Sequence, residues 1–285
     1  EEIDMTWKIV TDSGCDLRRI EVLAEHTEFQ NVPLTIQIGS EIFVDDEGLD
    51  VANMMTTMYA SPVSSKSSCP SPDAFLQAYQ GAENVIAITI TGNLSGSQNS
   101  AQVAKHMLLE EHPNINVYVI DSLSAGGEID LIVEELNRLI AKGLSFDEVV
   151  EAITDYQEKT KLLFVLARVD NLVKNGRLSK LVGKVIGLLN IRMVGKASDE
   201  GKLELLHKAR GQKKAVQATV EEMFKEGYQG GKVMIAHANN EKACQQLSDK
   251  IKEKYPQADV RFIPASGLCS FYGEDGGILL GYETV

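Results

Sequence analysis

The chain has 285 residues, of which 44% are hydrophobic and 24% are charged, and its formal net charge at pH 7 is −13. This length suffices for two domains with separate cores, and the acidic balance argues against nucleic acid or an anionic membrane as a bulk partner, because both repel an acidic surface. The sequence has neither the run of ~20 apolar residues that a membrane helix needs nor a secretory signal, so we expect a cytoplasmic protein that is not an integral membrane protein.

The first half alternates short β-branched segments with amphipathic helices. We predict strands at residues 7–13, 32–38, 85–90 and 115–121, and helices at about 97–111, 127–142 and 145–160. Ser145 followed by Glu148 is typical of a capping box at the start of the last of these helices. The alternation indicates a mostly parallel sheet with helices on both faces.

The second half begins with a strand-like run at 162–166. After it we predict a helix at 178–189 with Leu189 on its apolar face, a hairpin of residues 192–198 and 202–208 joined at Asp199-Glu200-Gly201, and strands at 232–238 and 259–264 separated by a helix that ends near Tyr255. We therefore predict an α/β fold of two α/β domains. Residues 1–160 hold a mostly parallel sheet, residues 161–285 hold a mixed sheet with helices, and a ligand lies between them.

Two polar loops are candidate anion-binding sites. Leu94-Ser95-Gly96-Ser97 links a strand to a helix, and Ser67-Ser68-Cys69-Pro70-Ser71 precedes a helix that starts at Pro72. The free N–H groups of a helix start and the nearby hydroxyls suit a carboxylate or a phosphate. The alternatives are an ordinary polar turn for the first loop and a flexible linker for the second.

Other motifs are weak or missing. Gly92-Asn93-Leu94-Ser95-Gly96 is offset by one residue from a nucleophile elbow, and the glycine patterns of dinucleotide and P-loop sites do not occur. The cysteines at 15, 69, 244 and 269 lack CxxC spacing, which favours reduced thiols over a zinc site or a disulfide framework. Four aspartates fit no metal-ligand spacing and are interpreted mainly as turn or cap residues: Asp12, Asp45, Asp46 and Asp121.

The motifs form an ordered set that covers nearly the whole chain. They lie at residues 9–13, 32–35, 46–50, 67–72, 94–97, 121–122, 175–179, 188–191, 208–210 and 213–215. In order and spacing this set resembles the DegV family of bacterial fatty-acid-binding proteins.

The resemblance implies one long-chain fatty acid, such as palmitate, stearate or oleate, in an apolar tunnel between the domains. It implies no catalytic residue, metal or cofactor in this chain, because a separate ATP-dependent fatty acid kinase would convert the presented carboxylate to an acyl phosphate. The ligand-binding residues implied by the family motifs are Ser67, Ser68, Leu94, Ser95, Gly96, Ser97 and Tyr272. Arg177 and Arg210 match basic positions that would face the kinase or the phosphate, and the alternative is two solvated surface arginines.

One segment departs from the family pattern. Residues 272–276 read Tyr-Gly-Glu-Asp-Gly where the family typically reads His-Thr-Gly-Pro-Gly. Tyr272 can donate a hydrogen bond but cannot become cationic as histidine can. Either Glu274 and Asp275 face solvent, or the headgroup is not a plain carboxylate. Two other functions remain open: a hydrolase or transferase that uses Ser95 or Ser67, and a binder of a different small anionic lipid or polar anion.

Overall fold

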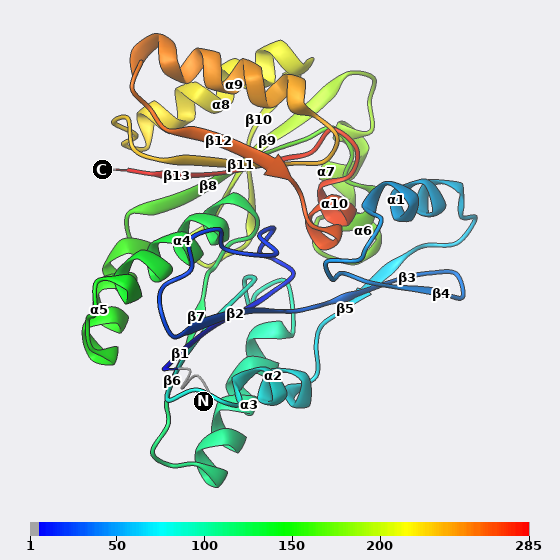
Figure 1. Ribbon diagram of the computed structural model, residues 1–285. Helices are drawn as coiled ribbons and strands as arrows, with labels where there is room; N and C mark the ends of the chain where they lie inside the picture. Colours follow the sequence, from blue (N-terminus) through cyan, green and yellow to red (C-terminus); the bar gives the residue numbers. More distant parts are fainter. Residues whose placement is uncertain (1–5, 285) are drawn as a thin grey trace.

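A parallel β-sheet with the strand order β2-β1-β6-β7 forms the centre of the first half (Figure 1) in the computed structural model, which describes residues 6–284. Its strands are β1 (Trp7–Asp12), β2 (Thr27–Val32), β6 (Asn84–Thr89) and β7 (Asn116–Asp121). Helices α2 (Pro72–Tyr79) and α3 (Ser97–Glu111) cover one face, and α4 (Gly127–Ala141) and α5 (Phe146–Gln157) cover the other. The predicted parallel sheet with helices on both faces is confirmed.

The segment 32–38 is not the single strand that we predicted. Pro33 has no N–H to donate to a sheet ladder, and the N–H of Leu34 donates to the Ser13 hydroxyl at 2.8 Å. β2 therefore ends at Val32, and the chain enters a separate antiparallel sheet with the order β4-β3-β5. That sheet and the helix beside it comprise β3 (Thr35–Ile38), β4 (Glu41–Val44), β5 (Lys66–Ser68) and α1 (Val51–Ala60).

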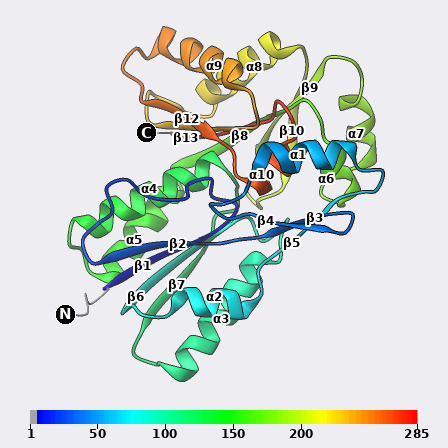
Figure 2. The ribbon, with the colours of Figure 1, turned by 45° about the vertical axis from the view of Figure 1, so that its right-hand side comes forward.

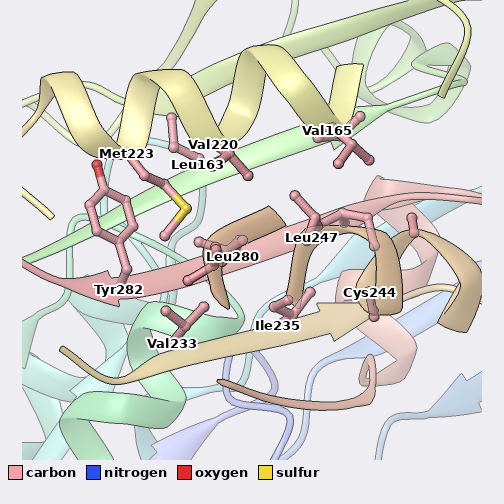
Figure 3. Close-up of a cluster of buried hydrophobic side chains, with 14 of the residues drawn as sticks. Leu163, Val165, Val220, Met223, Val233, Ile235, Cys244, Leu247, Leu280 and Tyr282 are labelled. Carbon is pink, nitrogen blue, oxygen red and sulfur yellow. The ribbon is translucent and has the colours of Figure 1, made fainter. Parts of the chain in front are cut away.

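A mixed sheet with the order β10-β9-β8-β13-β11-β12 forms the second half. Its strands are β8 (Thr160–Leu166), β9 (Ile191–Ala197), β10 (Leu203–Arg210), β11 (Val233–His237), β12 (Val260–Pro264) and β13 (Ile278–Glu283). β11 and β12 pair in parallel and the other neighbours pair antiparallel. Helices α8 (Gln212–Lys225) and α9 (Glu241–Lys254) cover one face of this sheet, and Figure 3 shows their apolar side chains meeting those of β8, β11 and β13.

Helix α4 lies between the two large sheets. One side of it packs on the parallel sheet through Ile129, Ile132 and Leu136. Its first turn lies so close to the mixed sheet that a Cβ on Gly127 would clash with the backbone oxygen of Met234. Because both sheets pack on this one helix, the two halves are held together through a shared layer.

The region after β8 differs from its predicted form. A shorter helix, α7 (Lys180–Ile186), stands where we predicted a helix at 178–189, and an additional short helix, α6 (Asp170–Lys174), precedes it. Ser179 caps α7, because its hydroxyl accepts the N–H of Val182, and the helix ends at Gly187. Leu189 therefore lies beyond the helix with 94% of its surface exposed, and its predicted place on a buried apolar face is wrong.

Other local predictions are confirmed. Helix α3 spans the predicted residues, and both capping-box hydrogen bonds between Ser145 and Glu148 are present at 3.3 Å. The hairpin of β9 and β10 turns at the predicted residues 199–201. Within residues 6–284 no helix has the length and apolar run needed to cross a membrane.

The last helix, α10 (Gly267–Gly273), returns from the second half to the first. It packs beside α1 (Figure 2). The division into residues 1–160 and 161–285 remains a prediction, and residues 1–5 and 285 lie outside the described part of the chain. The proposed boundary falls at the start of β8, a strand of the mixed sheet that packs on α4.

Candidate functional site

A cavity of about 390 Å³ lies between the two halves, within the size range of small-molecule sites. Much of its wall is aliphatic or aromatic, including Leu162, Phe164 and Leu166 of β8, Leu203 of β10 and Leu279 of β13. These side chains lie on the inner face of the mixed sheet, opposite α8 and α9. The surroundings suit an apolar chain because they offer dispersion contacts and little competing hydrogen bonding.

Tyr272 and Ser67 form a polar pair in this wall. The hydroxyl of Ser67 on β5 lies 2.6 Å from the hydroxyl of Tyr272 on α10, so one of them donates to the other. The guanidinium of Arg177 lies 5.6 Å from the centre of the Tyr272 ring, within the range of a cation–π contact. Two residues that are 205 positions apart in the sequence thus meet at the wall, and they leave one hydroxyl proton and one nearby positive charge for an anion.

The second predicted loop lines the same cavity through Leu94, Ser95 and Gly96. The Ser95 hydroxyl accepts the N–H of Ser97 at 3.2 Å, which leaves its own proton for another acceptor. A Cβ on Gly96 would lie 3.0 Å from the sulfur of Cys69, so the two serine loops are in close contact. The structure therefore brings both predicted loops to one cavity, and Ser68 is also part of the lining.

Ser97 and Arg210 lie elsewhere. The hydroxyl of Ser97 is fully buried and donates to Asp12 at 2.5 Å. Burial raises the pKa of Asp12 to about 6, against the opposing effect of hydrogen bonds from Ser97, Gly14 and Ile90. Arg210 is exposed at the end of β10, outside the cavity lining, whereas Arg177 lines the cavity and donates to the backbone oxygen of Leu94 at 3.1 Å.

The acidic residues after Tyr272 point away from the cavity. Glu274 is buried, and its carboxylate accepts the N–H of Asn171 at 3.0 Å in a separate small pocket. Burial, the largest influence, raises the pKa of Glu274 above its ordinary value. Asp275 lies at the surface, where its carboxylate accepts from Asn239 at 3.4 Å. Of the two, only Asp275 is directed toward solvent, and neither adds negative charge to the cavity wall.

Two buried aspartates position α10, and sequence reasoning did not assign them that role. The Asp45 carboxylate accepts the N–H groups of Gly267 and Leu268 at 2.9 and 2.8 Å, and Asp16 accepts that of Ser266 at 2.7 Å. Arg18 pairs with Asp45 at 2.6 Å. The three bonds to backbone N–H groups join residues more than 220 positions apart, so no local pattern could have revealed them. They fix the helix that carries Tyr272.

The cysteine thiols and the possible metal ligands of this region also limit its chemistry. Cys69 and Cys269 both line the cavity, and burial raises the pKa of the Cys269 thiol well above its ordinary value, which disfavours the thiolate. Among the described residues no group of three or more histidine, cysteine, aspartate or glutamate side chains is placed to hold a metal ion. The arrangement is suited to holding an apolar molecule with a polar end.

Fold and cavity together define a class: two-domain α/β proteins with a ligand cavity between the halves. The chain belongs to the DegV family, since the family model described as "Uncharacterised protein, DegV family" matches residues 6–283. A DegV domain-containing protein from Streptococcus pyogenes serotype M1 is 70% identical over 279 residues, which cover 98% of this chain and all of that protein.

Two solved structures are similar to this one over nearly their whole length. The Streptococcus pneumoniae fatty acid kinase B3 protein loaded with linoleic acid has 65% identity and a TM-score of 0.97, covering 99% of this chain and 100% of that one. A DegV family protein from Eubacterium eligens loaded with heptadecanoic acid has 39% identity and a TM-score of 0.94, covering 98% and 100%. Both relatives were thus crystallised with a long-chain fatty acid.

Proposed function

We propose that this protein binds one long-chain fatty acid in the cavity between its halves, with the carboxylate near Ser67 and Ser95. The observation that carries the proposal is an apolar cavity whose wall includes the hydroxyls of Ser67, Ser95 and Tyr272. The fatty acids bound by the Streptococcus pneumoniae and Eubacterium eligens relatives support the choice of ligand.

The proposed headgroup contacts follow from the chemistry of a carboxylate. An anion away from water needs several donors, because an unpaired buried charge is costly. The Ser67–Tyr272 pair and Ser95 can each direct one hydroxyl proton to it, and the N–H groups around Gly96 lie in the same loop. Arg177 adds positive charge beside Tyr272 without occupying the headgroup position itself.

We further propose that the bound carboxylate is presented to a separate ATP-dependent fatty acid kinase and that this chain is a non-catalytic subunit. The name of the Streptococcus pneumoniae relative supports this role. Arg177, at the cavity wall, and Arg210, exposed on β10, are the proposed contacts to the kinase or to the phosphate of the product. A hydrolase acting through Ser67 or Ser95 is less favoured, because their hydrogen-bond partners are Tyr272 and the Ser97 backbone rather than a base.

The binding test starts with protein purified from cells. Solvent extraction followed by mass spectrometry should recover about one acyl chain per protein, of palmitate, stearate or oleate type. A protein that holds no stoichiometric fatty acid and takes up neither added oleate nor palmitate would contradict the proposal.

Substitutions test the headgroup assignment. Each lost hydrogen bond to a charged group is worth about 1.5–3 kcal/mol, so Ser95→Ala should weaken oleate binding by roughly tenfold to a hundredfold. The matched control is Thr56→Ala, which removes an exposed hydroxyl on α1 and should bind oleate like the parent. If Ser67→Ala/Ser95→Ala together bind oleate with parental affinity, these serines do not hold the headgroup.

A further inference from the structure

The tip of the β9–β10 hairpin crosses from the second half and fastens onto the loop that carries Ser95. The hydroxyl of Thr91 donates to the backbone oxygen of Gly201 at 2.7 Å, and this contact is buried. The amide of Asn93 donates to the backbone oxygen of Glu200. Both donors come from the first half and both acceptors from the hairpin tip, so the two bonds close a seam between the halves.

The tip fits this seam closely. Gly201 has a φ of +77°, in the left-handed region that favours glycine. A Cβ on it would clash with the Thr91 hydroxyl and lie 2.9 Å from the Cα of Leu123. Leu123 itself has a φ of +54°, which is uncommon for a residue with a bulky side chain and marks a strained contact.

The seam lies where the cavity meets an outer groove. Thr91 and Leu94 line the cavity on one side of it, and Gly201, Lys202 and Leu203 line it on the other. Outside, an open groove shares Leu94, Lys202 and Leu203 with the cavity wall. The rest of the outer groove is mixed, with Leu178, Val182, Met193 and Leu205 beside the polar residues Asn93, Asn175, Arg177 and Ser179.

A hinge motion of the two halves offers a poor route to the cavity. It would pull α4 away from one of the two sheets that it packs on and expose buried apolar side chains to water. Lifting the hairpin tip breaks the Thr91 and Asn93 hydrogen bonds and the contacts at Gly201, and it leaves α4 in place between the two sheets.

We propose that the β9–β10 hairpin tip is a latch, and that a fatty acid passes between the outer groove and the cavity when Thr91 and Asn93 release the Gly201 and Glu200 backbone oxygens. The proposal rests on the proposed function, because it concerns exchange of that ligand. A latch that closes over both the empty and the loaded cavity sets the rates of uptake and release and leaves the equilibrium affinity nearly unchanged.

The test compares two substitutions of Thr91. Thr91→Val has the same shape without the donor, and Thr91→Ser keeps the donor and is the matched control. Protein loaded with radiolabelled oleate is mixed with excess phosphatidylcholine vesicles, and release is followed by filtration; uptake is followed in the reverse direction. We expect Thr91→Val to speed both rates about fivefold with the dissociation constant within about twofold of the parent, and Thr91→Ser to match the parent.

A reversible cross-link tests the same route from the other side. Asn93→Cys/Glu200→Cys, oxidised to a disulfide that peptide mapping verifies, should slow release at least about tenfold, and reduction should restore it. If the disulfide forms incompletely, the Thr91 comparison decides alone. Unchanged rates in Thr91→Val, or weakened affinity without faster uptake, would overturn the latch. A parent protein that retains no oleate would instead overturn the proposed function.

Discussion

The family resemblance predicts that Tyr272 takes the place of a histidine, and the substitution of Tyr272 by phenylalanine tests the site most directly. The change removes a hydroxyl that lies 2.6 Å from the Ser67 hydroxyl. Ser67 can then turn its own proton to the ligand, so the net loss is one neutral donor. A neutral hydrogen bond is worth about 0.5–1.5 kcal/mol, which predicts oleate binding about two- to tenfold weaker.

Tyr272→His extends the test to pH. An imidazole at this position can become cationic, with an ordinary pKa near 6.5. The Arg177 guanidinium faces this ring, and the nearby Glu274 carboxylate bonds to Asn171 and does not face the ring. Because a neighbouring positive charge disfavours a cationic imidazole, we expect the imidazole pKa to lie below that value. Its affinity relative to the parent should therefore rise as the pH falls below about 6.5, whereas the ratio for Tyr272→Phe should stay constant.

The assay is displacement of a fluorescent fatty acid by oleate from pH 5 to 8. Dividing each affinity by that of the parent at the same pH cancels the titration of the ligand. Tyr118→Phe, on β7 outside the cavity lining, is the control and should follow the parent throughout. Indistinguishable curves for the parent, Tyr272→Phe and Tyr272→His would show that this position does not touch the headgroup.

Three further predictions concern stability, packing and partner contact. The Asp130 carboxyl accepts the backbone N–H of Asp16 at 2.8 Å, and burial raises the pKa of both carboxyls. The folded protein therefore keeps a proton that the unfolded chain loses near pH 4, and the free energy of unfolding falls as the pH rises above that value. Asp130→Asn replaces the titrating carboxyl with an amide, which still offers an N–H donor. Urea unfolding of this variant at pH 7 should therefore show about 1 kcal/mol more stability and a flatter pH dependence. A lower stability at pH 7 would contradict this reasoning. Gly195→Ala would place a Cβ 2.5 Å from the ring of Phe164, so it should destabilise the fold by about 1–3 kcal/mol and lower the capacity for oleate in a titration. Arg210→Ala should leave oleate retention unchanged and reduce acyl phosphate formation when kinase and ATP are added; unchanged product would remove Arg210 from the contact surface.

The sequence predicted the elements whose signals are local. Helix α3 begins where the polar loop at 94–97 ends, and Ser145 with Glu148 marks the start of α5, because capping depends on neighbours three residues apart. The hairpin at residues 199–201 also follows from its own turn residues. The prediction of a single strand at 32–38 was wrong because it ignored the effect of Pro33. The strand of the parallel sheet ends before this proline, and the chain then enters a second sheet.

The site could be predicted only in part. The serine loops were recognised as motifs, but their meeting at one cavity depends on tertiary packing. The roles of Asp16 and Asp45 could not be predicted, because the N–H groups that they accept lie at the start of α10, near the other end of the sequence. Leu162 and Phe164 look like ordinary core residues in the sequence, since an apolar cavity wall and a filled core have the same composition.

The position of α4 has a consequence for biosynthesis. Its first turn packs against β13, which comprises residues 278–283 and leaves the ribosome long after the helix itself. Until β13 has been made, the mixed sheet lacks the strand that makes the most contact with α4, so part of the second side of the helix stays exposed. A nascent chain stalled before β13 is expected to be cleaved by proteases within α4, and this vulnerability should disappear once residue 283 has been released.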